Sequence, residues 1–286
     1  AHHLMSPSVE IRAIIGSHLS VKDGFDPSAT QADNAVKKAK EVLQVMNISK
    51  AIPVLAGSNV AMPDDSTPVK SAAVNFIIQE ALRTDTKQPL YVVCGAGLTE
   101  IASALLTNPD IAGKLTLIWI GGPEYTDLAP PPPNYTEVEY NLNIDRAAAR
   151  VVFNKSTVAL WQVPRNMYRQ CLFSYAQLLT KVKPHGKTGA HLSGTLEMLM
   201  ARIQRFLNIG EMYVLGDSPL VLLTALQSSF EADPSSSQYV VRQAPRINGA
   251  GTYAYNHAGR PIRVYTHLDT GLMFADFIAK LELMYP

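Results

Sequence analysis

The chain has 286 residues, of which 47% are hydrophobic and only 17% are charged. This length is enough for one large α/β unit or for two domains of about 150 residues. Its 25 Lys and Arg residues nearly balance its 24 Asp and Glu residues, and a net charge of +1 excludes the broad basic surface of a nonspecific nucleic-acid-binding protein. No apolar run approaches the about 20 residues that span a bilayer. Two cysteines, Cys94 and Cys171, do not make a disulfide scaffold and leave the redox compartment undecided.

Short β-rich runs alternate with amphipathic stretches along the first part of the chain. Apolar residues at helical spacing indicate helices, and short runs rich in Val, Ile and Leu indicate strands. In chain order, the predicted elements are a strand at 9–15, a helix at 30–46, a strand at 52–55, a helix at 69–82, a strand at 90–93, a helix at 98–106 and a strand at 115–120. This alternation predicts an α/β fold with a mainly parallel sheet covered by helices.

Four consecutive prolines, Pro130 to Pro133, lie in the segment 123–134. Proline lacks an amide proton and favours extended backbone, so this segment is predicted to be a loop. It is either a stiff linker between two domains or a loop within one domain. We favour the second interpretation, because long loops in compact domains are more often functional.

Helices dominate the prediction after the proline-rich segment. In chain order, we expect a helix at 144–153, a strand at 158–163, helices from 168 to 207 with an interruption at 183–189, a helix at 219–227, a strand pair at 239–242 and 262–265, and a closing helix at 271–283. No internal repeat and no inserted domain is recognisable.

Three short segments carry residues that could bind a ligand or take part in catalysis. The segment 94–99 (CGAGLT) is a glycine-rich turn between a strand and a helix. It lacks the full dinucleotide fingerprint and the Lys-Ser/Thr of a P-loop, so a tight turn is the better interpretation of its sequence. It nevertheless lies where the carboxyl ends of sheet strands form ligand crevices.

The segment 139–145 (EYNLNID) is the second candidate. In extended backbone Glu139, Asn141 and Asn143 would share one face, and a carboxylate with two amides can exchange hydrogen bonds with sugar hydroxyls. The alternative is helix capping, which is the more probable role of Asp145.

The third candidate is Asp217, which stands between two apolar runs just before Pro219. An Asp at a helix start caps the helix by default, but here it could equally coordinate a hard cation such as calcium.

The seven histidines show no zinc spacing, and no nucleophile elbow is present. His18 follows the first predicted strand and is a minor candidate for substrate contact, whereas Trp119 is interpreted as a core residue.

In their order and spacing, these segments resemble the inosine–uridine nucleoside hydrolase family over nearly the whole chain. The matching stretches are 7–15 (PSVEIRAII), Asn34-Ala35, 52–57 (IPVLAG), 97–99 followed by 115–122 (LTLIWIGG), Glu139-Tyr140-Asn141 followed by 144–153, Gly216-Asp217, and 261–283. The resemblance implies a three-layer α/β sandwich with a mainly parallel central sheet, in one domain over residues 1–286.

The resemblance also implies a reaction. In the family, calcium at the carboxyl ends of the strands binds two ribose hydroxyls and a water, which attacks the anomeric carbon as the base departs. The ligand chemistry is suitable, because calcium accepts about six to eight oxygen ligands and lowers the pKa of bound water. Transferred to this chain, Asp217 and the Gly95 carbonyl would be metal ligands. Glu139 and Asn141 would hold the sugar, and Asn134 is a weaker candidate for its 5′-hydroxyl.

Two departures from the family pattern affect this interpretation. The opening aspartate-rich motif, which supplies the catalytic base, has no counterpart here, and residues 1–5 look like the end of a helix. We therefore expect that motif upstream of Ala1. The His that commonly precedes the late Asp is Gly216 here, so it cannot protonate the leaving group.

The leading hypothesis is a calcium-dependent N-glycosidase acting on ribonucleosides or a related ribosyl compound. The alternatives are a divergent relative acting on another carbohydrate or glycoside, and a non-catalytic sugar-binding protein that kept Glu139 and Asn141. The expected partner is a small nucleoside or sugar, with no nucleic acid and no membrane. Family members are often dimers or tetramers, which implies a homo-oligomer by resemblance alone.

Overall fold

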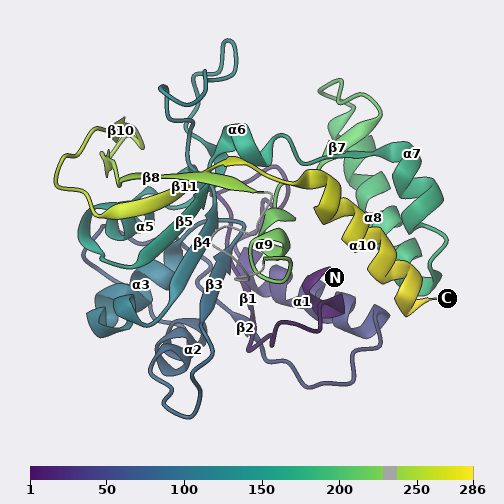
Figure 1. The fold of residues 1–286 in the computed structure, drawn as a ribbon, viewed down its shortest axis with the longest axis horizontal. Coiled ribbons are helices and arrows are strands. Elements are labelled where there is room, and N and C mark those ends of the chain that lie inside the picture. The colour runs from purple at the N-terminus through teal and green to yellow at the C-terminus, as the bar shows by residue number, and fades with distance from the viewer. Residues whose placement is uncertain (228–236, 286) are drawn as a thin grey trace.

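A five-stranded sheet forms the centre of the computed structural model, which describes residues 1–227 and 237–285. Its strands, in order across the sheet, are β3 (Tyr91–Cys94), β4 (Thr116–Ile120), β5 (Ala159–Val163), β11 (Pro261–His267) and β8 (Gln238–Gln243). The first four are parallel, and β8 runs antiparallel to β11 (Figure 1). The mainly parallel sheet and the final strand pair are thus confirmed.

Helices cover both faces of this sheet. In β4, Leu117 and Trp119 point into the core that is shared with α2 (Ala72–Ala81), α3 (Thr99–Thr107) and α5 (Arg146–Arg150). Ile118 and Ile120 point to the other face, which packs against α9 (Pro219–Leu222) and the start of α10 (Thr270–Met284). This alternation follows from the period of two in a strand. It explains why β4 reads as a continuous apolar run and produces the predicted three layers.

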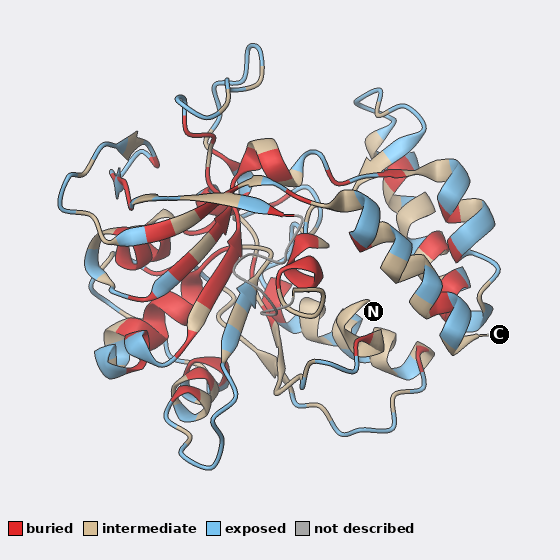
Figure 2. Ribbon diagram, in the orientation of Figure 1, coloured by how far each residue is buried: buried red, intermediate tan, exposed pale blue. Residues whose placement is uncertain are grey.

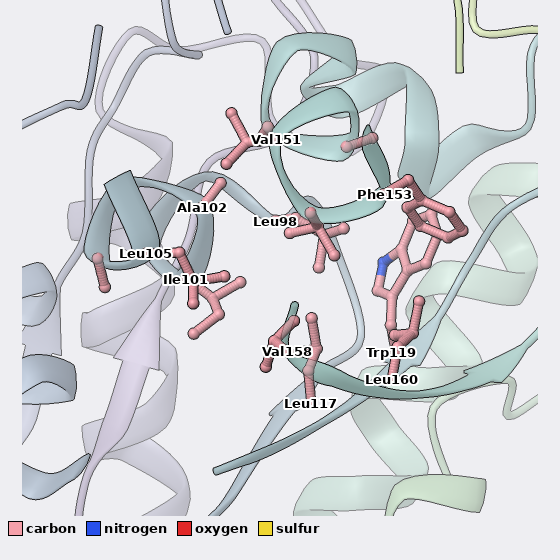
Figure 3. Close-up of a cluster of buried hydrophobic side chains, with 14 of the residues drawn as sticks. Leu98, Ile101, Ala102, Leu105, Leu117, Trp119, Val151, Phe153, Val158 and Leu160 are labelled. Atoms are coloured by element: carbon pink, nitrogen blue, oxygen red, sulfur yellow. The ribbon is translucent and has the colours of Figure 1, made fainter. Parts of the chain in front are cut away.

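Buried apolar side chains gather where α3 and the segment after α5 meet β4 and β5. Trp119 is fully buried there, as the sequence predicted, and its indole Nε1 donates to the Ala96 carbonyl at 2.9 Å. Figure 3 shows its ring beside Phe153 and Leu160, and Figure 2 shows that burial concentrates on the sheet and these helices. The core therefore braces the turn that follows β3.

A smaller parallel sheet lies next to the central one. It pairs β1 (Ile14–Gly16) with β2 (Val54–Ala56), and α1 (Gln31–Val45) packs on both strands. The strand predicted at 9–15 is therefore mostly wrong, because residues 9–13 pair with no strand in the described parts of the chain. Within those parts, β3 is an edge strand of the central sheet.

Helices and a short strand pair form a region beside the sheet. The elements are α6 (Arg165–Tyr168), α7 (Tyr175–Gln177) continued by a π-helical turn at Leu178–Val182, and α8 (Gly186–Ile203). Strands β6 (Leu172–Ser174) and β7 (Met212–Val214) pair antiparallel and were not predicted, because three-residue strands carry almost no periodic signal. No helix in the described residues is long and apolar enough to cross a membrane.

The helix predicted at 144–153 begins earlier and is divided. Residues Tyr140–Ile144 form α4, Arg146–Arg150 form α5, and a π-helical turn follows at Val151–Lys155. Asp145 separates α4 from α5 and caps α5, accepting a hydrogen bond from the Ala148 amide at 2.8 Å. The capping role expected for Asp145 is thus observed. The predicted helix at 219–227 is also shorter, since α9 ends at Leu222.

Candidate active site at the carboxyl ends of the strands

The parallel strands β3, β4 and β5 end on the same side of the sheet, each in a residue that shapes the backbone. β3 is followed by Gly95, β4 by Gly121 and Gly122, and β5 by Pro164. At Gly122, φ is +87°, and a side chain would collide with the Tyr253 hydroxyl. Glycine is therefore required there, and it turns the Gly122 amide toward Glu139.

Asp217 lies directly against the turn after β3. A Cβ atom at Gly95 would stand 2.6 Å from the Asp217 carboxyl carbon, so only glycine allows this approach. The side chain does not cap α9, whose start has no side-chain cap bond. Within the described residues, the carboxylate has no hydrogen-bond or ion-pair partner.

Asp217 is exposed but closely surrounded by protein atoms. Solvent reaches the side chain, although protein atoms surround it closely enough that burial raises the pKa of its carboxyl to about 7. Burial also raises the pKa of the neighbouring Tyr213 hydroxyl, and the Asp217 charge adds to this effect. An uncompensated carboxylate in such a place is able to bind a cation or to exchange a proton near neutral pH.

Glu139 has the opposite environment. Its residue is 1% exposed, and its carboxylate accepts four hydrogen bonds: from the amides of Gly122 (2.7 Å), Leu142 (3.0 Å) and Asn141 (3.2 Å), and from the Tyr168 hydroxyl (2.7 Å). Glu139 is therefore the N-cap of α4. The extended face predicted for Glu139, Asn141 and Asn143 is wrong, because the chain turns into a helix at Tyr140.

Asn141 is brought to the same strand end. Its Nδ2 donates to the Ile120 carbonyl at 2.7 Å, at the last residue of β4, and the residue is only 9% exposed. This bond fixes the amide plane and leaves the carbonyl oxygen Oδ1 as an available acceptor. Asn134 lies apart in the proline-rich loop, exposed and with φ of +59°.

His18 belongs to a buried network rather than to an open surface. Its Nδ1 lies 2.8 Å from the Leu19 carbonyl and its Nε2 lies 2.9 Å from Thr99 Oγ1. The Thr99 hydroxyl in turn donates to Asp145 Oδ2 at 2.7 Å. The Thr99 hydroxyl thus links the His18 ring to the Asp145 carboxylate. Substrate contact by His18 stays a prediction.

A second buried carboxylate joins the ends of β1 and β2. Glu100 Oε2 accepts the Ser17 hydroxyl at 3.1 Å, and Oε1 accepts the Ser58 amide at 2.9 Å. Desolvation raises the pKa of the Glu100 carboxyl, opposed by these bonds and by the His18 charge. The ends of the two short strands are thus joined to α3 through polar contacts.

Two features of the site were missed by the sequence reasoning. Tyr168 of α6 donates to Glu139, and Arg165 forms a buried ion pair with Glu124 through Nε at 2.7 Å and through Nη2. The available signal was positional, because Arg165 follows β5 and Glu124 follows Gly121-Gly122-Pro123. Charged residues directly after buried parallel strands are candidates for a site.

Among the described residues, few oxygen donors at this end of the sheet are available to a calcium ion. The Asp217 carboxylate and the Gly95 backbone offer oxygen atoms, which suit a hard cation. Nowhere in residues 1–227 and 237–285 do three or more His, Cys, Asp or Glu side chains gather as a metal site would require. These residues therefore suit a hard cation in kind, but they supply too few ligands for calcium alone.

The fold is an α/β sandwich whose candidate site residues lie at the carboxyl ends of parallel strands. The inosine-uridine preferring nucleoside hydrolase family model matches residues 3–276. The chain therefore belongs to this family of hydrolases that act on N-glycosyl compounds. The resemblance found in the sequence is thus confirmed.

Solved structures show the same fold at low sequence identity. A plant nucleoside hydrolase, PpNRh1, superimposes with a TM-score of 0.72 and 17% identity, covering 98% of this chain and 93% of its own. A purine-preferring ribonucleoside hydrolase from Gardnerella vaginalis gives 0.74 and 17%, covering 99% and 93%. An inosine-uridine preferring nucleoside hydrolase from Bacillus anthracis gives 0.64 and 15%, with the same coverage of 99% and 93%. No curated protein sequence matches this one.

Proposed function

We propose that this protein hydrolyses the N-glycosidic bond of ribonucleosides or a related ribosyl compound at the carboxyl ends of β3 and β4. The observation that carries the proposal is Asp217, a solvent-reached carboxylate held against Gly95 with no partner in the described residues. An unpartnered carboxylate surrounded by protein is costly to the fold, and such a cost is typical of a functional group. We also propose one domain over residues 1–286.

Calcium is the cofactor that we propose, with Asp217 and the Gly95 carbonyl among its ligands. Bound there, it would position sugar hydroxyls and a water and lower the pKa of that water. The described residues supply only part of the coordination that calcium requires.

The sugar would lie beside the amino end of α4. Asn141 offers its Oδ1 to a hydroxyl while its Nδ2 remains bonded to the Ile120 carbonyl. Glu139 would order this edge of the sugar site by holding the Gly122 amide and the Tyr168 hydroxyl in place. A sugar hydroxyl could bond to Glu139 only by replacing one of its four donors. Asn134 would approach from the proline-rich loop. A negative environment near the anomeric carbon would stabilise an oxocarbenium-like transition state.

The direct test measures ribose release from inosine and uridine with calcium added. We expect Asp217→Asn to lower kcat/KM by about 100-fold or more, the loss typical of a key electrostatic group, and to weaken calcium binding measured by calorimetry. Glu211→Gln is the matched control, because Glu211 is also exposed and lies six residues earlier.

Two results would contradict the proposal. Ribose binding without release from any nucleoside would favour the non-catalytic sugar-binding alternative. Unchanged calcium affinity in Asp217→Asn would remove Asp217 from the metal site.

A further prediction concerns Asn141. Asn141→Ala should raise KM or lower kcat without unfolding the protein, and wild-type kinetics in that variant would exclude Asn141 from the site.

A further inference from the structure

One guanidinium nitrogen of Arg165 has no acceptor among the described residues. Arg165 is the first residue of α6 and is only 6% exposed. Its Nε and Nη2 hold the two carboxylate oxygens of Glu124, whereas Nη1 is buried with no hydrogen-bond partner in the parts of the chain that the structure describes. A buried donor on a charged group is costly when it is left unpaired. Nη1 is therefore a donor available to a negatively charged acceptor.

The proline-rich loop covers this guanidinium group. The Tyr135 ring stacks over Arg165 with 4.2 Å between Cζ and the ring centroid, and Tyr135 itself is 40% exposed. Tyr135 follows Pro130 to Pro133, whose fixed backbone limits how the loop can move. Because Tyr135 is exposed and lies over the guanidinium group, it marks the side from which a ligand would reach Nη1.

The same group adjoins the place proposed for the sugar. Tyr168 lies one helical turn after Arg165 in α6, and its hydroxyl donates to Glu139. The Glu139 charge is already offset by four donors, so it opposes a nearby anion less than a free carboxylate would. Asn134 precedes Tyr135, and its exposed amide has no hydrogen bond to any described residue.

We propose that Arg165 and Asn134 bind a phosphate group on the side of the sugar that faces the proline-rich loop, so that the substrate is a phosphorylated ribosyl compound. The planar guanidinium group suits phosphate oxygens, because its charged N–H donors form short and strong hydrogen bonds. This inference rests on the proposed function, since it takes the sugar to lie beside Glu139.

The test is a binding measurement on the full chain. Ribose 5-phosphate and ribose are titrated by calorimetry at the same pH and with the same added calcium. Because a charge-assisted bond is made only with the phosphate, we expect ribose 5-phosphate to bind at least about tenfold more tightly. Equal affinities, or no measurable binding of ribose 5-phosphate, would overturn the inference.

Variants assign the preference to its residues. The double variant Arg165→Gln with Glu124→Gln removes both charges of the pair, so that neither remains buried alone, and it should bind the two sugars equally. Arg169→Gln is the control, because Arg169 is an exposed arginine at the C-cap of α6 and should leave the preference unchanged. Should the double variant not fold, Asn134→Ala provides the same test at an exposed position, with an expected several-fold loss of preference. An unchanged preference in the variant measured would overturn the assignment.

The outcome can be separated from that of the proposed function. Neither sugar carries a base, so binding does not depend on catalysis. A phosphate preference without hydrolysis of any nucleoside or nucleotide would contradict the proposed function and support this inference. Hydrolysis of inosine combined with equal sugar affinities would do the reverse.

Discussion

Glu139 and Asp217 are two carboxylates at the same end of the sheet, and they differ in almost every contact. Glu139 is buried and accepts four hydrogen bonds from the backbone and from Tyr168. Asp217 is reached by solvent and has no partner in the described residues. Surrounding a carboxylate with protein atoms costs desolvation free energy. Hydrogen-bond donors offset this cost at Glu139, whereas none does so at Asp217 among the described residues.

This difference indicates that the two carboxylates have different roles in the site. The bonds of Glu139 fix the geometry of α4, the Gly122 turn and α6 relative to one another, so its first contribution is to order the site. Asp217 contributes nothing comparable to the fold, and its carboxylate is available for a cation or a proton. Substitutions should therefore affect stability at Glu139 and function at Asp217.

The largest stability effect is expected for Glu139→Gln. Glutamine keeps one acceptor oxygen but turns an NH2 group toward donors that had bonded to the other oxygen. We expect the free energy of unfolding to fall by about 2–3 kcal/mol, the cost of leaving buried donors unpaired, measured by urea denaturation.

Glu137→Gln is the matched control for this change. Glu137 lies two residues earlier and is exposed, so its substitution should stay within about 0.5 kcal/mol of the wild type. If both variants lose the same stability, the four bonds of Glu139 do not carry the difference between the two carboxylates.

How far the sequence predicts this arrangement depends on the range of each contact. The apolar run of β4, the proline-rich loop and the helix at Gln31–Val45 follow from local patterns, and they are observed. The partners of Glu139 do not follow, because the Gly122 amide and the Tyr168 hydroxyl lie 17 and 29 residues away. An extended face was predicted there because alternating polar residues suggest a strand, and a Glu at an N-cap is an uncommon signal.

The ion pair of Arg165 and Glu124 was missed for the same reason. Its members are 41 residues apart, and each follows a different strand, so only the parallel order of β4 and β5 brings them together. The family resemblance placed Asp217 at the strand ends, but the absence of a partner for it among the described residues depends on the whole surrounding fold. Local sequence thus specifies the elements, and the sheet order specifies the site.

A smaller effect is expected for Thr99→Val in the buried network at the ends of β1 and β3. The change removes the hydroxyl that joins His18 to Asp145, leaving a buried imidazole nitrogen unpaired. Asp145 still accepts the Met62 and Ala148 amides, so the loss should be limited to about 1–2 kcal/mol.

Thr107→Val provides the comparison within the same helix. Among the described residues, the Thr107 hydroxyl bonds only to the Ser103 carbonyl one turn earlier. Thr107 is exposed, so loss of this hydroxyl should cost less than about 0.5 kcal/mol. Equal effects of the two variants in urea denaturation would show that the His18 network adds no more than an ordinary helix hydroxyl.

The smallest change in stability, and the one of opposite sign, is expected for Asp217→Asn. Because burial raises the pKa of Asp217 to about 7, above the value of about 3.9 for an unfolded chain, the folded state binds more protons than the unfolded state between these values. Stability of the metal-free protein should therefore fall as the pH rises from about 4 to 7. Asparagine removes this term, so the variant should show a flatter pH profile and, at neutral pH, a Tm higher by about 1–3 °C, with solvent access keeping the gain small. Glu211→Gln should keep the wild-type slope. A destabilised Asp217→Asn protein, or one with an unchanged slope, would mean that Asp217 is held by the fold as Glu139 is, and the contrast between the two carboxylates would be lost.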